Sequence, residues 1–271
     1  MVEYILGKIA VITGGSTGIG AACIKKFFKN GLTGCSILDV DESGAALAQE
    51  MNCRYGYNKA LFFKADVRDK CAFERALKET IKRHRKIDLL INNAAIGKDR
   101  IWETMTDINV KGTVISTLLG IKYMGKNNCY YGGTIVNTSS VLGLEPLSGL
   151  PCYTGTKHFV VGLNRCFSTQ YWYDLTGIRF LTFCPGITSM VGSAEDYVLE
   201  GFPNLKQFLE KDLKREKLQS SERLAEGMMT MLNEGKNGSI WVSWREQPVF
   251  EVELPSINQM SHSGKCHFKA K

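Results

Sequence analysis

The sequence predicts an α/β fold: a single domain built on a doubly wound parallel sheet with helices on both faces. The chain has 271 residues, which is enough for one large core, and its hydrophobic (44%) and charged (23%) fractions are those of an ordinary globular domain. Short apolar runs alternate with segments of helical periodicity over the first two thirds of the chain. Because strands linked in this way are joined by right-handed crossovers, the alternation predicts parallel strands.

The elements follow from the same alternation, taken in chain order. Apolar runs of strand length occur at 8–13, 35–40, 61–67, 88–95, 134–140, 179–184 and 240–244. Apolar residues at helical spacing occur at 24–28, with Gly31 as the stop signal, and then at 45–51, 72–85, 102–126 and 153–175. Residues 250–254 alternate as an edge strand or a strand that contacts a second copy does.

Two segments break the alternation and define the predicted organisation. We assign residues 1–255 to one cofactor-binding domain and interpret 188–220 within it as a substrate lid. The apolar side chains of that lid suit a pocket for a hydrophobic substrate, and we expect Met190 and Phe202 to line it. Residues 256–271 are expected to form a flexible C-terminal tail.

Several classes of function are disfavoured by composition. The net charge of +7 comes from basic residues dispersed among 27 acids, so we expect no nucleic-acid partner. No apolar run approaches the roughly 18 residues of a membrane span, and we expect no membrane span. Nine cysteines without a Cys-x-x-Cys pair or a secretory signal predict reduced thiols and a cytoplasmic location. Four histidines lack metal-ligand spacing, so we expect no metal.

A glycine-rich turn between the first strand and the first helix predicts a dinucleotide site. Glycines let the backbone approach a pyrophosphate, and the unpaired N–H groups of the helix N-terminus face the anion. By itself the pattern also fits a merely tight turn. The expected cofactor contacts in the turn are Gly14, Ser16, Thr17, Gly18, Ile19 and Gly20.

An acid at the end of the second strand predicts which dinucleotide binds. Asp39 follows Gly20 by 19 residues, the position at which a carboxylate accepts both ribose hydroxyls of NAD. The same carboxylate repels a 2′-phosphate, and Val40 and Asp41 bring no cation to neutralise one. We therefore expect the cofactor to be NAD and not NADP.

A second constellation predicts proton chemistry. Tyr153 and Lys157 are four residues apart, so they share one face of a helix, and Ser140 ends the preceding strand. A tyrosine with a pKa of about 10 is a poor base at neutral pH, but a neighbouring cation favours the phenolate. Tyr153 is then the candidate general base, while Ser140 holds the substrate oxygen.

In their order along the chain, these residues resemble the short-chain dehydrogenase/reductase family over about residues 5–255. The motifs that carry the resemblance are 13–20, 92–95, Asn109, Ser140, Tyr153, Lys157 and 185–186. The resemblance implies a Rossmann fold, a homodimer paired through the helices 102–126 and 153–175, and a proton relay in which Asn109 joins Lys157 through a water. It also implies cofactor contacts from Asp66, Val67, Asn93, Tyr153, Lys157, Pro185, Gly186 and Thr188.

Within the family, two groups compete for this chain. Residues 100–144 are similar to NAD-dependent 15-hydroxyprostaglandin dehydrogenases, whereas 153–157, 184–188 and 237–241 are similar to insect-type short-chain alcohol dehydrogenases. Leu150 stands where the prostaglandin enzymes have a glutamine that holds the substrate, so we place Leu150 in the substrate pocket. The same departure counts against prostaglandin as the substrate. Ala95 stands where the family motif has a glycine. An alanine fits there only if the backbone φ at residue 95 is negative.

The resemblance and the residues together predict an NAD-dependent oxidoreductase. The expected substrate is a hydrophobic secondary alcohol, a lipid alcohol among the candidates, or its ketone. Two alternatives stay open: a non-catalytic NAD-binding or storage relative, and an NADPH-dependent carbonyl reductase.

Overall fold

The computed structural model of the protein describes residues 4–188, 193–214, 216–245, 247–256 and 259. Its strands are β1 (Ile9–Thr13), β2 (Gly34–Asp39), β3 (Ala60–Lys64), β4 (Leu89–Asn92), β5 (Gly133–Thr138), β6 (Ile178–Pro185), β7 (Ile240–Ser243) and β8 (Phe250–Val252). They form one sheet in the order β3-β2-β1-β4-β5-β6-β7-β8. The pairs from β3 to β7 are parallel, and β8 runs antiparallel to β7 at the edge. The prediction of a doubly wound sheet is confirmed.

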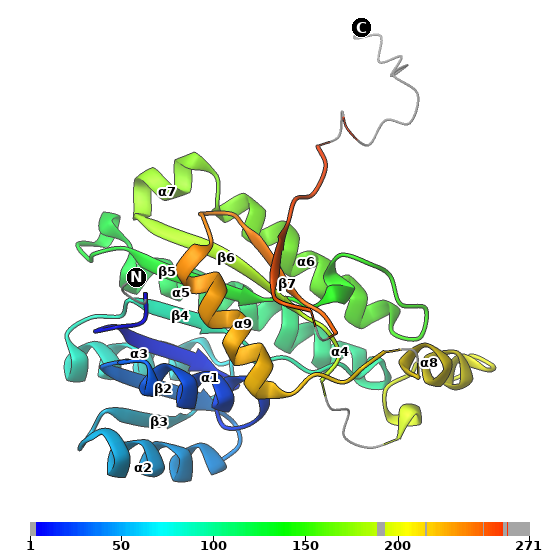
Figure 1. Cartoon of the computed structure of the whole chain (residues 1–271), viewed down its shortest axis with the longest axis horizontal. Helices are drawn as coiled ribbons and strands as arrows, with labels where there is room; N and C mark the ends of the chain where they lie inside the picture. The colour runs from blue at the N-terminus through cyan, green and yellow to red at the C-terminus, as the bar shows by residue number, and fades with distance from the viewer. Residues whose placement is uncertain (1–3, 189–192, 215, 246, 257–258, 260–271) are drawn as a thin grey trace, which may run out of the picture.

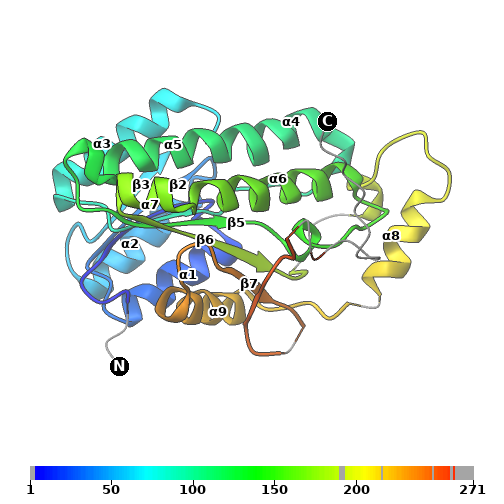
Figure 2. The ribbon, with the colours of Figure 1, turned by 90° about the horizontal axis from the view of Figure 1, so that it is seen from above.

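Helices cover both faces of the sheet (Figure 2). The helices are α1 (Gly18–Lys29), α2 (Ser43–Tyr55), α3 (Lys70–His84), α4 (Trp102–Thr106), α5 (Thr113–Met124), α6 (Pro151–Phe167), α7 (Gln170–Thr176), α8 (Leu205–Leu213) and α9 (Ser221–Glu234). Figure 2 shows α3, α4, α5 and α6 on one face and α1, α2 and α9 on the other. In Figure 1, α8 lies beyond the carboxyl ends of the strands and α7 lies at the opposite end.

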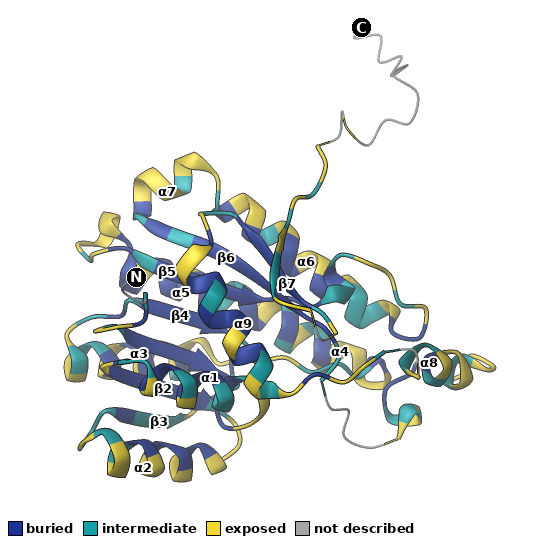
Figure 3. Cartoon of the chain, viewed as in Figure 1, coloured by how far each residue is buried: buried dark blue, intermediate teal, exposed yellow. Residues whose placement is uncertain are grey.

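Each helical layer buries an apolar stripe against the sheet, as the dark blue inner surfaces in Figure 3 show. On one face, Phe27 of α1 and Met228 of α9 belong to one buried cluster with Ile12 of β1. On the other face, Phe73 of α3 and Leu119 of α5 belong to a second cluster. A fully buried side chain of this size contributes roughly 1.5–3 kcal/mol, so the two clusters are the main source of stability.

The helix predicted over 153–175 is wrong as one element, because α6 ends at Phe167 and α7 begins at Gln170. The hydroxyls of Ser168 and Thr169 donate to the carbonyls of Arg165 and Cys166. Such side-chain bonds compete with the helical pattern, and the helix is interrupted there.

The helix predicted over 102–126 is continuous in space but changes its winding. A π-helical segment, Asp107–Gly112, separates α4 from α5. Helix α9 has no counterpart in the sequence analysis, although its N-cap Ser220 and its buried apolar residues follow the ordinary helix pattern. No helix within the described residues is long and apolar enough to cross a membrane.

The strand order fixes where a site can form. The chain leaves β1 toward β2 on one side, and β4 continues the sheet on the other, so the order reverses between β1 and β4. In open parallel sheets a crevice forms at the carboxyl ends of the strands at such a reversal. Residues Thr13–Gly20 and Asn93 follow β1 and β4 at this point.

Candidate active site

The glycine-rich turn brings the N-terminus of α1 close to the end of β1. Gly14 has a φ of +62°, and a Cβ added at Gly20 would overlap the carbonyl oxygen of Gly14. Thr17, the N-cap of α1, makes no side-chain cap hydrogen bond, and the first turn contains no acid. The free N–H groups and the dipole of α1 therefore remain available for an anion.

A cavity of about 610 Å³ opens beside this turn and contains the predicted adenosine-side residues. Asp39 lines it, accepting hydrogen bonds from the backbone N–H groups of Ser16 (2.9 Å) and Asp41 (3.1 Å). Those bonds fix the carboxylate at the end of β2. The other predicted residues that line this cavity are Gly14, Thr17, Ile19, Asp66, Val67, Asn93 and Thr188.

Asp66 has a partner that the sequence analysis missed. Arg68 lines the same cavity, and its guanidinium reaches the Asp66 carboxylate at 2.6 Å and 3.0 Å. The hydrogen bonds from Arg68 lower the pKa of Asp66. This cation is therefore paired with a carboxylate that lines the same cavity.

Asn93 ties the end of β4 to the glycine-rich turn. Its amide donates to the carbonyls of Thr13 (3.1 Å) and Gly14 (3.0 Å). The hydroxyl of Thr13 in turn accepts from the N–H groups of Asn93 and Ala94. Ala95 is not among the described non-glycine residues with positive φ, so the condition for replacing the family glycine is met.

Ser140, Tyr153 and Lys157 line a second cavity of about 290 Å³, which is the candidate catalytic cavity. The Nζ of Lys157 lies 5.5 Å from the centre of the Tyr153 ring and donates to the carbonyl of Thr138 at 3.1 Å. Ser140 Oγ lies 3.5 Å from the carbonyl oxygen of Pro185 and accepts the N–H of Leu142. The three residues predicted from the sequence as one set therefore share one cavity.

Burial sets the protonation of this set. It raises the pKa of Tyr153 to about 12, with the hydrogen bond to Ser140 acting in the opposite direction. It lowers the pKa of Lys157 to about 8, since the residue is only 3% exposed. The protein alone thus keeps the phenol protonated, and a positive charge brought into the cavity would favour the phenolate.

Asn109 lies in the π-helical segment and reaches the same neighbourhood. Its side chain is buried and pairs with both backbone groups of Ile96, donating to the carbonyl (2.8 Å) and accepting from the N–H (3.0 Å). It also donates to the hydroxyl of Thr156 at 3.1 Å, next to Lys157. Single turns of π-helix are frequent at functional sites, and here the turn directs a buried amide at the loop after β4.

The predicted substrate residues have three different outcomes. Leu150 is buried, lines the catalytic cavity and packs with Tyr197 and Leu209. Phe202 is 62% exposed and lines a separate surface depression with Arg100 and Glu195, so the structure does not bring it to Tyr153. Met190 lies outside the described residues, as do 257–258 and 260–271 of the predicted tail.

Further residues of the catalytic cavity, Thr138, Tyr197 and Leu213 among them, are not in the predicted set of site residues. Thr138 Oγ1 is a buried hydroxyl without a hydrogen-bond partner in this structure. Tyr197 and Leu213 bring the segment after β6 over Tyr153. Thr138 is the last residue of β5, two residues before Ser140, and this spacing could have been read from the sequence. The placement of Tyr197 and Leu213 depends on long-range packing.

The two cavities together fit a dinucleotide. Ile19, Asn93, Ala95 and Thr188 line both of them, so the space runs from Asp39 to Tyr153 without a break. Pro185 and Gly186 line the catalytic end. Gly14, the uncapped N-terminus of α1 and the unpaired hydroxyl of Thr138 offer close approach and free polar groups along this path.

Comparison with known proteins agrees with this geometry. The short chain dehydrogenase family model matches residues 8–197. The human 15-hydroxyprostaglandin dehydrogenase [NAD(+)] is 30% identical over 247 residues, covering 88% of this chain and 91% of that protein. Alcohol dehydrogenase 2 of Ceratitis rosa is 31% identical over 245 residues, with the same coverage of 88% and 91%.

A solved structure shows the same fold. The short chain dehydrogenase/reductase from Burkholderia phymatum, determined in complex with NAD, superposes with a TM-score of 0.74 and 22% sequence identity, covering 88% of this chain and 89% of that one. The chain described here belongs to the short chain dehydrogenase family, a family of oxidoreductases. The family resemblance expected from the sequence is confirmed.

Proposed function

We propose that this protein is an NAD-dependent alcohol dehydrogenase that oxidises a hydrophobic secondary alcohol to its ketone, or reduces the ketone. The observation that carries the proposal is the shared cavity of Ser140, Tyr153 and Lys157, which is continuous with the cavity around Asp39. The relatives named for NAD, at about 30% identity, support the choice of cofactor.

The oxidation converts a secondary alcohol and NAD⁺ into a ketone, NADH and a proton. NAD, when bound, supplies the nicotinamide carbon that takes the hydride from the alcohol carbon. Tyr153 takes the hydroxyl proton as its phenolate, and Ser140 donates a hydrogen bond to the substrate oxygen. Lys157, cationic below its pKa of about 8, favours that phenolate. Asp39 accepts the ribose hydroxyls, and the N-terminus of α1 faces the pyrophosphate.

The apolar walls of the cavity support a hydrophobic substrate. Leu142, Leu147, Leu150 and Leu213 surround the space next to Tyr153. Apolar walls exclude water, which strengthens each hydrogen bond made to the substrate oxygen. Leu150 offers no polar contact of the kind that a glutamine would provide.

The first test is Tyr153→Phe. This variant keeps the ring and removes the hydroxyl, so we expect turnover of a secondary alcohol to fall about 100- to 10,000-fold. NADH binding, followed by fluorescence titration, should stay unchanged. Tyr173→Phe, which removes the hydroxyl of a tyrosine on α7 that does not line the cavity, is the matched control. Turnover near that of the unmodified protein in Tyr153→Phe would overturn the proposal.

Assays in both directions separate the alternatives. Reduction of the ketone with NADPH in preference to NADH would support a carbonyl reductase instead. NADH binding without oxidation of any alcohol, from small branched alcohols to sterols and hydroxylated fatty acids, would support a non-catalytic relative.

We also propose a homodimer paired through α4, α5 and α6. Trp102, Leu118 and Phe159 stand on these helices with 47%, 50% and 37% of their surface exposed. Apolar side chains of this size on one set of helices suit an interface. Light scattering at micromolar concentration should give twice the mass of one chain, and a monomer would contradict the proposal.

The cysteines support a proposed cytoplasmic location. All of those in the described residues are free, and Cys23, Cys35 and Cys184 are buried. Burial raises the pKa of the Cys23 and Cys184 thiols to about 12, which keeps them protonated and unreactive. Fractionation of cells that express the tagged chain tests the location.

A further inference from the structure

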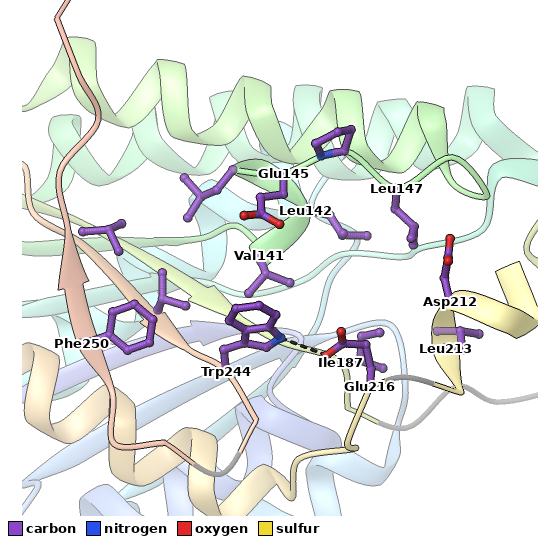
Figure 4. A pocket seen from close by; sticks show the side chains of 14 residues that line it. Val141, Leu142, Glu145, Leu147, Ile187, Asp212, Leu213, Glu216, Trp244 and Phe250 are labelled. Carbon is purple, nitrogen blue, oxygen red and sulfur yellow. Dashed lines mark hydrogen bonds between the residues drawn. The ribbon is translucent and has the colours of Figure 1, made fainter. Parts of the chain in front are cut away.

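A third cavity, of about 410 Å³, adjoins the cavity of Ser140, Tyr153 and Lys157 on the side of β7 and β8 (Figure 4). Its walls come from the loop after β5, the end of α8, strand β7 and the edge strand β8. Leu142, Leu147, Ile187 and Leu213 line both cavities, so the two spaces are adjacent and meet at apolar side chains. None of its lining residues lines the cavity around Asp39, so the space does not belong to the nucleotide site.

The interior of this cavity is apolar. Trp244 and Phe250 form its inner wall together with Val252, and Val141 and Leu144 close it from the loop after β5. Apolar surface of this kind, continuous with the substrate site, suits a hydrocarbon chain or ring that extends away from the reacting carbon.

Within the described residues, the charged side chains that line the cavity are acids. Glu145, Asp212 and Glu216 line it, and Figure 4 shows Glu145 on the loop side, Asp212 on α8 and Glu216 beside the Trp244 indole. Glu216 accepts the Trp244 N–H at 3.0 Å and pairs with Arg245 at 3.2 Å. Within the described residues, neither Glu145 nor Asp212 forms an ion pair.

The described basic residues of the same stretch do not line the cavity. Lys211, Lys214 and Lys217 are exposed, and none of them lines the cavity. Two unpaired carboxylates at an apolar cavity repel a third, and an anionic group that enters must also lose its water.

We propose that this cavity takes the far end of the substrate and selects alcohols whose far end carries no anionic group. The inference rests on the proposed function and narrows it: the substrate is an extended apolar secondary alcohol with an uncharged or cationic end. A hydroxylated fatty acid, with its carboxylate at that end, is disfavoured by Glu145 and Asp212.

The test compares a long-chain hydroxy acid, with its hydroxyl on the penultimate carbon, with the methyl ester of the same acid. For the unmodified protein with NAD, we expect kcat/KM for the ester to exceed that for the acid by about tenfold or more. The double variant Glu145→Gln, Asp212→Asn should bring this ratio close to one. The control Glu222→Gln, Glu234→Gln removes two exposed acids of α9 that line neither cavity and should keep the ratio.

A binding measurement keeps the test independent of turnover. The methyl ester should change the tryptophan fluorescence of the cofactor-free protein at lower concentration than the acid does, and Trp244→Phe should remove most of that change. Binding of the ester without oxidation of any alcohol would overturn the proposed function and leave the cavity assignment intact. Oxidation of short secondary alcohols, with ester and acid used and bound equally, would overturn the cavity assignment alone. A ratio that the double variant leaves unchanged would also overturn it.

Discussion

Asp99 accepts a hydrogen bond of 2.8 Å from the backbone N–H of Tyr153, the proposed general base. Its other carboxylate oxygen accepts the N–H of Cys152 at 2.7 Å. The carboxylate is fully buried, and Leu150 at the N-cap of α6 makes no side-chain cap bond. Asp99 therefore acts as the cap of the helix that holds Tyr153, although it comes from the loop after β4.

The residues around Asp99 join this cap to the segment after β6. The N–H of Asp99 donates to the carbonyl of Tyr197 at 2.8 Å, and Lys98 lies 5.6 Å from the centre of the Tyr197 ring. Arg100 forms an ion pair with Glu200. The segment that covers the catalytic cavity is thus fastened to the residues that position Tyr153.

Asp99→Asn tests this positioning role. The amide presents N–H groups to at least one backbone N–H of α6, so we expect a loss of about 1 kcal/mol in the free energy of unfolding and a fall in kcat of about tenfold. Asp69→Asn is the matched control, because Asp69 caps α3 by accepting the N–H of Ala72 at 2.9 Å and does not line the cavity of Tyr153. If both variants lost stability and kept kcat, Asp99 would be a structural cap only.

Asp39→Asn should weaken the discrimination between cofactors. The amide cannot repel a 2′-phosphate as the carboxylate does, so the preference for NADH over NADPH in fluorescence titration should fall about tenfold. Asp41→Asn is the control, since Asp41 does not line the cavity around Asp39. Equal affinity of the unmodified protein for both cofactors would contradict the role of Asp39.

Lys157→Met should change how stability depends on pH. The pKa of Lys157 is lowered to about 8 in the folded protein, below its value of about 10.4 in an unfolded chain. Between these values the unfolded chain binds more protons, so the contribution of Lys157 to the free energy of unfolding rises with pH. Relative to Lys157→Met, the unmodified protein should gain about 2 kcal/mol between pH 7 and pH 10.

Urea unfolding at several pH values measures that difference. Comparing the two proteins cancels the contribution of the buried thiols, whose raised pKa values act in the opposite direction above pH 9. Lys29→Met, which removes an exposed lysine of α1, is the control variant. A constant difference for Lys157→Met would refute the assigned pKa.

Two glycine substitutions should act in opposite directions. Gly20→Ala places a methyl group against the Gly14 carbonyl oxygen, so we expect a loss of more than about 2 kcal/mol and of NADH binding. Gly162→Ala adds its methyl group to an exposed site in α6 with no atom within 4 Å, and should stabilise the protein by about 0.5–1 kcal/mol. Unfolding in urea measures both, and a tolerated Gly20→Ala would contradict the close approach of α1 to β1.

The sequence was sufficient for those features that depend on local patterns. The strands came from short apolar runs, and every predicted strand is present, though β4 ends at Asn92 and not at 95. The set of Ser140, Tyr153 and Lys157 came from helical spacing and a strand end, and these residues meet in one cavity. The break between α6 and α7 was missed because the apolar spacing continues through it to Trp172, while two hydroxyls interrupt the backbone pattern.

Features that depend on distant contacts were not predictable in this way. The π-helical winding around Asn109 is supported by hydrogen bonds to Ile96, 13 residues earlier, which no periodicity reports. The acids Glu145 and Asp212 are 67 positions apart and meet only because α8 lies across the ends of the strands.

The edge strand β8 has a consequence for how such proteins diversify. The family match ends at residue 197, whereas Asp212, Trp244 and Phe250, which line the cavity of about 410 Å³, come later in the chain. Part of the wall of this cavity thus lies outside the stretch that carries the residues of the cavity around Asp39. Exchange of the C-terminal stretch between relatives would replace those walls and leave the residues of the cavity around Asp39 unchanged. Recombination of genes in this family is therefore a direct route to new substrate ranges.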